Sequence, residues 1–167
     1  MKVLVISDSH SVRSIMRTAV SQVKPNAIVH LGDHYEDGEV IGEENMHIPL
    51  YQVPGNCDAY RCFGKPELLC LDVFGVRMLM THGHRQHVKQ TQALLVKEAR
   101  QLGAAIALYG HTHVADVHRE DDGLLVMNPG ACGSYGGSVG VVEIENSQII
   151  RCTILSADGL TVLKELP

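Results

Sequence analysis

The sequence of 167 residues lacks the marks of several large classes of protein. It has no run of basic residues, and its 19 Asp and Glu outnumber its 14 Lys and Arg, so an electrostatic grip on long nucleic acid is not expected. No stretch approaches the ~18 apolar residues that a membrane-spanning helix needs. The apolar run that begins at Val3 is too short for the core of a signal peptide. These absences predict a cytoplasmic protein without a membrane or a long nucleic acid as partner.

Cysteine usage excludes two further classes. The five cysteines are an odd number and form no Cys-x-x-Cys pair, which argues against a disulfide framework and against a zinc ribbon. Reduced thiols fit the predicted cytoplasmic location. Neither a phosphate-binding P-loop nor a nucleophile elbow is present. With 45% hydrophobic residues, the chain has the composition of a globular protein, and its length predicts one domain over residues 1–167. A homo-oligomer is compatible with this composition.

The first part of the chain has the pattern of a β-α-β unit. Residues 3–7 read as a short buried strand, and residues 11–23 place apolar side chains at helical spacing. Ser11 is a candidate cap for this helix. Residues 26–31 form the next apolar run and end at Gly32-Asp33. A helix between two buried strands predicts that the strands are parallel.

Further strands and one more helix follow, and the last third of the chain has no helical pattern. We expect a helix over residues 88–102 and strands over residues 48–53, 68–74, 76–81, 105–109, 124–128, 139–145, 148–155 and 160–163. An α/β fold of two packed sheets with helices on the outer faces would accommodate this order. Periodicity alone also allows a single mixed sheet.

Polar residues with metal-binding side chains follow five of the predicted segments. They are Asp8 and His10, Asp33, Asn56, His82 with His84, and His111 with His113. Ligands of open α/β sheets bind outside the carboxyl ends of the strands, so these side chains are expected at one edge. If Asp8 and His10 lie on an extended segment, alternate residues point the same way, and the same holds for His111 and His113. Mixed imidazole and carboxylate ligands suit divalent Mn, Fe, Co, Ni or Zn.

The ordered set of motifs resembles one known family. Asp-x-His at 8–10, Gly-Asp at 32–33, Gly-Asn at 55–56, a mid-chain His82 and Gly-His-Thr-His at 110–113 are similar to the signature of the calcineurin-like metallophosphoesterases. Gly-Asn-Cys-Asp with Gly-His-Thr-His, at this chain length, resembles the small stand-alone phosphodiesterases of that superfamily. The resemblance extends from residue 3 to residue 130.

That resemblance implies a four-layer α/β/β/α sandwich with two divalent ions at one end, Mn being the first expectation. It assigns one ion to Asp8, His10 and His113, the other to Asn56, His82 and His111, and makes Asp33 the ligand that bridges both. The implied reaction is the hydrolysis of a small phosphodiester by a hydroxide that bridges the two ions. Asp33, Asn56 and His84 are the expected catalytic residues. His84 has no ligand role in the family pattern, but it could reach the substrate.

Two positions beside the motifs add expectations of their own. Cys57 stands where larger family members carry a histidine that is thought to assist the leaving group, so an efficient general acid is in doubt. Cations near Cys57 are expected to lower the pKa of its thiol. His34, next to Asp33, is a candidate for orienting a metal ligand.

Two other functions remain open from the sequence. The same fold serves as a non-catalytic scaffold for protein partners in the endosomal retromer coat, in a subunit that has lost part of its metal set. This chain keeps all seven ligand positions, which favours an enzyme. The alternative activity is that of a phosphomonoesterase.

Overall fold

The computed structural model describes residues 1–167, which build two mixed β-sheets. The first sheet has the strand order β11-β10-β9-β1-β2-β3. Strands β1, β2 and β3 are parallel, and β9, β10 and β11 continue the sheet in antiparallel pairs. The strands are β1 (Lys2–Ile6), β2 (Ala27–His30), β3 (Leu50–Gln52), β9 (Ser138–Glu145), β10 (Gln148–Ser156) and β11 (Val162–Leu166).

The second sheet has the strand order β4-β5-β6-β8-β7. Its three central strands are parallel, and the two edge strands pair antiparallel with their neighbours. The strands are β4 (Leu68–Val73), β5 (Val76–Thr81), β6 (Ile106–Leu108), β7 (Asp116–Arg119) and β8 (Leu125–Asn128).

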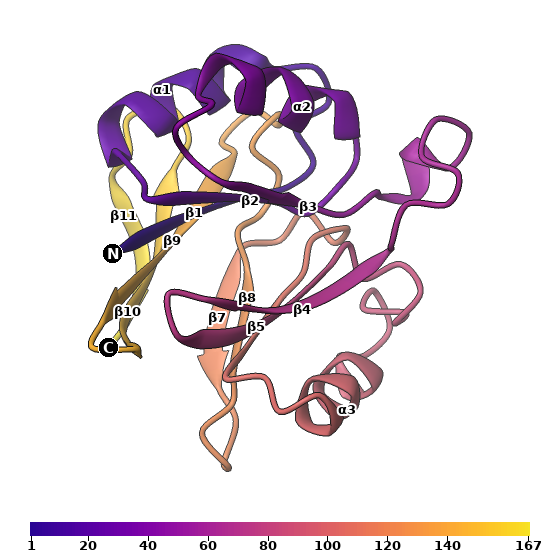
Figure 1. The fold of residues 1–167 in the computed structure, drawn as a ribbon, viewed down its shortest axis with the longest axis vertical. Coiled ribbons are helices and arrows are strands. Elements are labelled where there is room, and N and C mark those ends of the chain that lie inside the picture. Colours follow the sequence, from indigo (N-terminus) through magenta and orange to yellow (C-terminus); the bar gives the residue numbers. More distant parts are fainter.

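Helices cover the outer faces of both sheets, which gives the four layers visible in Figure 1. Helices α1 (Arg13–Val23) and α2 (Tyr35–Glu44) lie on the first sheet, and α3 (Ala93–Gln101) lies on the second. Between the sheets is a cluster of 19 buried residues drawn from both of them, which is the largest part of the core. The predicted four-layer α/β/β/α sandwich is confirmed.

Several local predictions were wrong at the edges of elements. The first helix begins at Arg13, and Ser11 makes no capping hydrogen bond to it. The helix predicted over residues 88–102 begins only at Ala93, because residues 84–90, after Gly83, form a series of turns. Helix α2 and strand β7 were not predicted, and the last strand lies at Val162–Leu166. None of the helices is long and apolar enough to cross a membrane.

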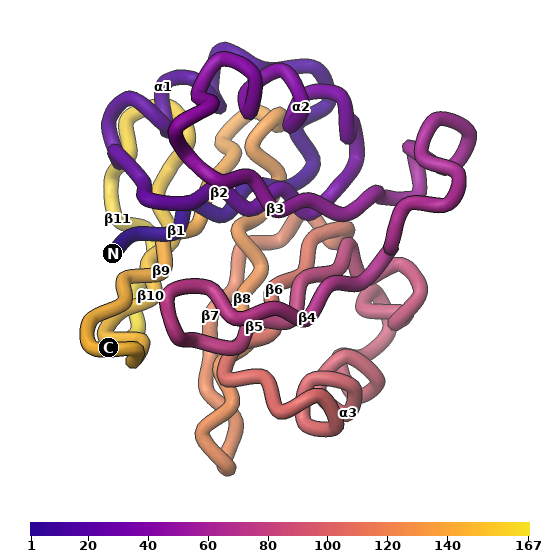
Figure 2. The backbone as a smooth tube through the Cα atoms, viewed as in Figure 1, coloured from indigo at the N-terminus to yellow at the C-terminus, as the bar shows by residue number.

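The topology brings the carboxyl ends of the parallel strands of both sheets to one end of the molecule. The backbone leaves the first sheet there in the turns after β1, β2 and β3, and it leaves the second sheet after β5 and β6. The short 3₁₀ helix η1 (Asn56–Asp58) lies directly after β3. Figure 2 shows the loop that follows it projecting from the body of the molecule.

Candidate metal centre

The turns at this end of the sandwich hold their residues in an unusual backbone conformation. The φ angles of Asp8, His10, Asp33, His111 and His113 are all positive, between 44° and 66°. Non-glycine residues are uncommon in this left-handed region, and a cluster of them marks a functional site rather than ordinary turns. The prediction of extended segments at 8–10 and 111–113 was therefore wrong. Tight turns, not strand alternation, aim these side chains toward one another.

Two glycines let these turns approach each other closely. Gly32 has a φ of 95°, and a Cβ on it would collide with the backbone of Gly55. A Cβ on Gly55 would in turn collide with Asp33. The glycines of the Gly-Asp and Gly-Asn motifs thus bring the two turns into backbone contact, which places Asn56 beside Asp33.

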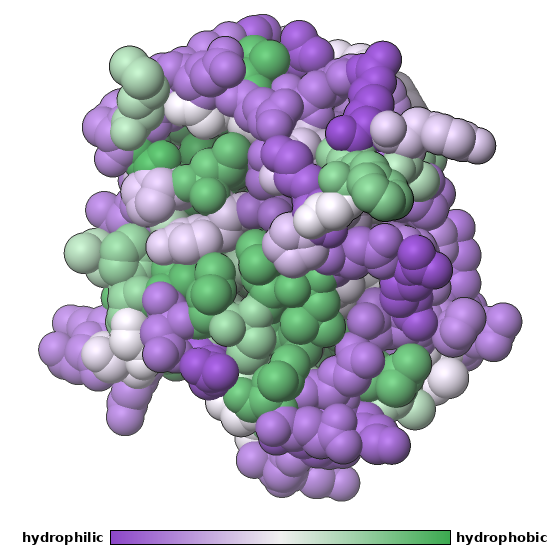
Figure 3. Space-filling view, turned by 45° about the vertical axis from the view of Figure 1, so that its right-hand side comes forward, coloured by the Kyte–Doolittle hydropathy of each residue, from purple (hydrophilic) through white to green (hydrophobic).

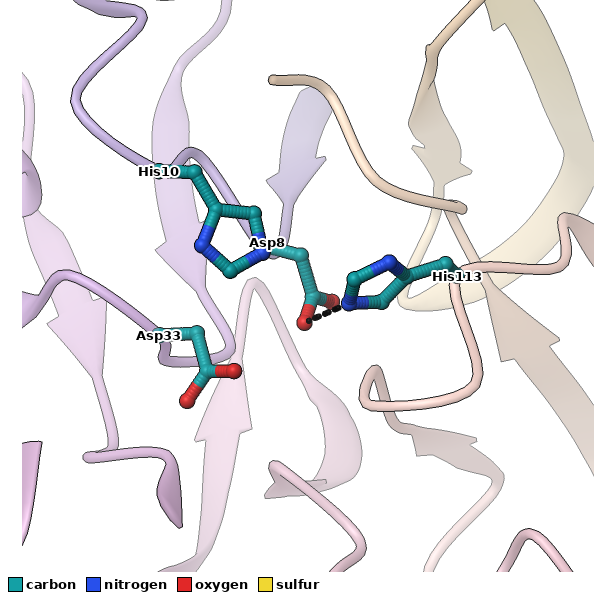
Figure 4. Close-up of side chains that lie close together, drawn as sticks. All are labelled: Asp8, His10, Asp33 and His113. Carbon is teal, nitrogen blue, oxygen red and sulfur yellow. Dashed lines mark ion pairs between the residues drawn. The ribbon is translucent and has the colours of Figure 1, made fainter. Parts of the chain in front are cut away.

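Four of the predicted ligands form a compact group. One candidate ligand atom from each of Asp8, His10, Asp33 and His113 lies within 4.8 Å of all the others. Figure 4 shows the four side chains around a common space, with Asp8 and His10 on the turn after β1 and His113 facing Asp8. Two carboxylates with two imidazoles are a suitable donor set for a divalent transition metal.

Asp8 has one oxygen that the protein does not satisfy. Its Oδ2 accepts hydrogen bonds from Ser7 Oγ at 2.5 Å and from the His111 backbone N–H at 3.2 Å. Its Oδ1 is buried and makes no hydrogen bond, although His113 Nε2 lies 3.0 Å away. Leaving a buried carboxylate oxygen unpaired is costly, and a cation between Oδ1 and the imidazole would relieve that cost.

The other half of the site brings a second group of ligand atoms together. His82 Nδ1 lies 2.8 Å from the carbonyl oxygen of Leu31, so this nitrogen is the hydrogen-bond donor. Nε2 of the same ring lies 3.1 Å from Asn56 Oδ1 and 3.5 Å from Asp33 Oδ1. One nitrogen and two oxygens thus converge, which is an arrangement that suits ligands around a cation.

Asp33 lies between the two halves. Its side chain is only 4% exposed, and its Oδ1 accepts the Cys57 N–H at 2.9 Å. Burial alone would raise the pKa of Asp33, but His82 and the hydrogen bonds from Cys57 hold it below the ordinary value. The carboxylate is therefore ionised at neutral pH and available to a metal.

The histidines of the second sheet complete this end. The His111 ring centroid lies 5.0 Å from that of His82, and burial, followed by the charge of His82, lowers the pKa of His111 to about 4. The His84 ring lies 5.5 Å from His82 and 6.2 Å from His111. Burial and His82 also lower the pKa of His84, and its buried Nδ1 has no hydrogen-bond partner. Neutral imidazoles are the form in which histidine binds metals.

Cys57 is turned toward Asp33. Its Sγ lies 3.3 Å from Asp33 Oδ2, and the Asn56 side-chain amide donates to the same sulfur at 3.5 Å. The residue as a whole is exposed, yet desolvation of the sulfur and then the Asp33 carboxylate raise the pKa of the thiol to about 11. The protein groups alone thus oppose the lowering that cations were expected to produce.

Sequence analysis missed Asp58, a buried carboxylate that joins two of the turns. Asp58 accepts hydrogen bonds from the backbone N–H groups of Gly55 at 2.8 Å, Tyr35 at 2.9 Å and His34 at 3.0 Å. It caps the start of α2 and at the same time closes the turn that carries Asn56. The signal was the Asp three residues after Gly55 in the Gly-Asn-Cys-Asp motif.

Asp37, on α2, was also missed and holds the first turn. It is fully buried, and it accepts hydrogen bonds from Arg13 Nε at 2.5 Å and from Ser9 Oγ and the Ser11 backbone N–H at 2.8 Å each. Ser9 Oγ lies 3.2 Å from Nε2 of the buried His30. The sequence offered no signal, because Asp37 stands among acidic residues typical of an exposed helix.

His34 contacts one of the predicted ligands. Its ring lies 5.3 Å from the His10 ring in an edge-on arrangement, and its Nδ1 lies 3.0 Å from Ser11 Oγ. This position fits the predicted orienting role of His34. His118, by contrast, is far from this group and pairs with Asp116 and Glu120 on β7 and its turn.

Comparison with known proteins places the chain in a family. Residues 1–147 match the model of the calcineurin-like phosphoesterase superfamily domain. A probable metallophosphoesterase of Bacillus subtilis is 38% identical over 97% of this chain and 89% of its own length. A phosphodiesterase of Methanocaldococcus jannaschii is 25% identical over 89% of this chain and 96% of its own.

A solved structure shares the fold. The crystal structure of wild-type Vps29 from Entamoeba histolytica, complexed with Zn²⁺, covers 99% of this chain and 98% of its own with a TM-score of 0.78 at 20% identity. Three findings indicate the same family. They are the matches in sequence, the four-layer sandwich, and the group of carboxylates and imidazoles at one end of it. The chain belongs to the calcineurin-like phosphoesterase superfamily.

Proposed function

We propose that this phosphoesterase hydrolyses phosphodiesters with two divalent metal ions held at the end of the sandwich. The observation that carries the proposal is a pair of close contacts between ligand atoms, Asp8 Oδ1 with His113 Nε2 and His82 Nε2 with Asn56 Oδ1, of which Asp8 Oδ1 is buried and accepts no hydrogen bond. The two contacts lie on either side of Asp33, which supports two ions rather than one. The M. jannaschii relative, named a phosphodiesterase, supports the choice of diesters.

The residues sort into two sets around the central carboxylate. Asp8, His10 and His113 would hold one ion, Asn56, His82 and His111 the other, and Asp33 would serve both. Mn²⁺ is the first candidate and Ni, Co, Fe or Zn the others, and the zinc complex of the Vps29 structure supports a transition metal. Bound ions would supply water activation and positive charge for the phosphoryl oxygens.

Other groups of the chain would orient the metal ligands and offer a neutral imidazole to the substrate. The Leu31 carbonyl fixes the His82 ring, and the His111 N–H fixes the Asp8 carboxylate. His84, neutral and with an unpaired buried Nδ1, stands beside His82 and His111, where it can hydrogen-bond to a substrate oxygen. Asn56 combines a ligand oxygen with an amide that holds Cys57.

A panel of substrates and metals tests the proposal. We expect metal-free protein to hydrolyse bis(4-nitrophenyl) phosphate only after addition of Mn, Ni, Co, Fe or Zn, and to hydrolyse 4-nitrophenyl phosphate more slowly. Metal analysis should find two ions per chain. A preference for the monoester would reverse the substrate assignment, and full turnover in chelator would contradict a metal mechanism.

The Asp33→Asn variant is the sharpest single substitution. Loss of outer-shell partners of a metal ligand already costs about 10–100-fold, so loss of a charged shared ligand should cost more than about 100-fold in activity and deplete both ions. Asp122→Asn, an exposed carboxylate on a distant turn, is the control and should retain both metals. Normal turnover in Asp33→Asn would remove Asp33 from the site. If the chain is instead a non-catalytic scaffold, no member of the panel should be hydrolysed.

A further inference from the structure

One aromatic ring near the site has no role in the fold. Phe63 lies in the loop that projects after η1 and is 97% exposed. In the space-filling view this region faces the viewer at the upper right, where a small hydrophobic area stands out from a hydrophilic surround. A ring that buries no area contributes nothing to the stability of the fold. Its position beside the proposed catalytic centre directs attention to a binding role.

The backbone of the loop presents this ring in a defined way. The Lys65 N–H donates to the Cys62 carbonyl at 3.0 Å, which closes a turn with Phe63 and Gly64 at its two central positions. Gly64 has a φ of 81°, the value that the second central residue of a type II turn requires. Cys62 is buried, and its N–H bonds to the Asp58 carbonyl at 3.0 Å. The turn is thereby anchored to the residue that also organises the candidate metal centre.

A groove connects the ring with the predicted catalytic residues. It has a volume of about 460 Å³ and is lined by Asn56 and His84 as well as by Phe63 and Arg85. This volume falls in the range of small-molecule sites. Two of the groups at the proposed catalytic centre therefore share one groove with an exposed aromatic ring.

The charges of the groove favour a phosphate ester. Lys65 and Arg85 line it together with a single carboxylate, Glu67, which pairs with Arg85 at 2.7 Å, while Lys65 Nζ pairs with Glu39 of α2 at 3.3 Å. The lining residues themselves thus include two cations and one carboxylate, although the whole chain has a formal net charge of −5. An ester that carries its phosphate at one end and a flat ring at the other matches this distribution.

We propose that Phe63 stacks on an aromatic group in the ester arm that stays on the phosphate, so that the groove selects phosphodiesters whose retained arm carries a nucleobase or an aryl ring. The proposal rests on the phosphodiesterase function stated above. Stacking on an aromatic side chain is worth about 1–3 kcal/mol per base, which corresponds to about 5- to 160-fold in affinity. Small alkyl diesters would lack this contact.

The absence of tryptophan from the chain provides a direct binding test. Phe63→Trp would be the single tryptophan, and we expect adenosine 5′-monophosphate with Mn²⁺ to quench its fluorescence. Phenyl phosphate shows whether a simple aryl ring suffices, and methyl phosphate tests the phosphate alone. The matched control is Tyr60→Trp, because Tyr60 lies in the same loop and is equally exposed but does not line the groove. Quenching by neither aromatic probe, or equal quenching in both variants, would overturn the proposal.

A kinetic test keeps the leaving group constant. Adenosine 5′-(4-nitrophenyl) phosphate and methyl 4-nitrophenyl phosphate release the same nitrophenolate and differ only in the second ester group. Phe63→Ala should lower kcat/KM about tenfold for the adenosine ester and leave the methyl ester unchanged, while Tyr60→Ala changes neither. Metal-dependent hydrolysis of both esters with no effect of Phe63→Ala overturns the stacking role and leaves the diesterase function standing. Hydrolysis of neither ester by the unmodified chain overturns the function itself.

Discussion

The residue Cys57 shows how a contact decides a chemical role. Its thiol faces the Asp33 carboxylate at 3.3 Å, and its backbone N–H donates to the same group. A side chain that is engaged with a metal-ligand candidate is poorly placed to protonate a departing alkoxide. The hypothesis that position 57 lacks an efficient general acid now rests on this contact and not on a thiolate, because the protein groups raise the pKa of the thiol to about 11.

The dependence of the rate on the leaving group should reveal whether a general acid is missing. We predict that rates fall steeply along a series of aryl and alkyl diesters as the leaving-group pKa rises, because a well-placed general acid is worth about 10²–10⁴-fold. Cys57→His should flatten the slope while changing nitrophenyl ester rates little. Parallel slopes for the two proteins would show that the proton comes from elsewhere, and His84→Gln would then be the variant to measure.

His30 should make the fold sensitive to acid. Burial lowers its pKa to about 4, although the charges of Asp58, Asp37 and Asp8 act in the opposite direction. Below the ordinary value of 6.5 the unfolded chain therefore takes up a proton that the folded chain refuses. Stability is fully present above pH 6.5 and is lost as the pH falls toward 4, by about 3 kcal/mol for this one group.

Urea unfolding in the presence of chelator measures this effect. The free energy of unfolding should drop between pH 7 and pH 5, and the drop should be smaller by up to one proton's contribution in His30→Gln. His84 and His111 act in the same direction, so some pH dependence should persist in the variant. An identical pH dependence in the two proteins would mean that His30 has the same pKa in the folded and the unfolded chain, which contradicts the prediction.

At the scale of elements, α2 illustrates what the sequence could not reveal. It carries Gly38 and Gly42 in its interior, and each glycine costs a helix about 1 kcal/mol relative to alanine. A Cβ at Gly38 would collide with the Gln52 side chain, and one at Gly42 would crowd Leu50. Close packing on β3 thus requires residues that weaken the helical pattern. Tertiary contacts, not local propensity, form this helix.

The buried strands and the order of the motifs, by contrast, were predictable. The runs that became β1, β2 and β5 are mostly apolar and buried, with Lys2 and Arg77 as exposed exceptions, because both faces of these strands are largely covered. The side chains that follow them were correctly expected at one edge of the molecule. The left-handed turns that aim Asp8, His10 and His113 were not predictable, since their geometry depends on contacts with distant turns.

The link between α2 and the Asn56 turn should matter for both stability and metal binding. We predict that Asp58→Asn lowers the free energy of unfolding by about 2 kcal/mol, because the amide offers its N–H₂ group to backbone donors that need an acceptor. Metal affinity should fall by about 10–100-fold as the turn loosens. Asp121→Asn, an exposed carboxylate, is the matched control.

Thermal unfolding and metal titration of both variants check this prediction. The metal loss should exceed what the lower stability explains, so the titration is done well below the melting temperature of Asp58→Asn. Unchanged metal affinity in a destabilised Asp58→Asn would reduce Asp58 to a helix cap with no part in placing Asn56.

At the scale of the whole molecule, the candidate metal centre joins the two sheets. Asp8, His10, Asp33 and Asn56 follow strands of the first sheet, whereas His82, His111 and His113 follow strands of the second. The sheets are also held together by the apolar cluster between them and, at the edge formed by β7 and β11, by the ion pair of Lys164 with Asp116. Ions bound by residues of both sheets would connect them at the end where the turns carry positive φ angles and unsatisfied atoms.

Metal should therefore stabilise the whole fold. We predict that the free energy of unfolding rises as RT ln(1 + [L]/Kd), by about 2.7 kcal/mol at a free metal concentration of 100 times Kd, and that chelator reverses the gain. His113→Ala is the informative variant, because its side chain is 44% exposed and its loss removes little packing. In chelator it should unfold close to the unmodified chain, whereas added Mn²⁺ should stabilise it less. A melting temperature that responds to neither Mn²⁺ nor chelator would show that no ion connects the two sheets, because binding to the folded state alone cannot leave stability unchanged.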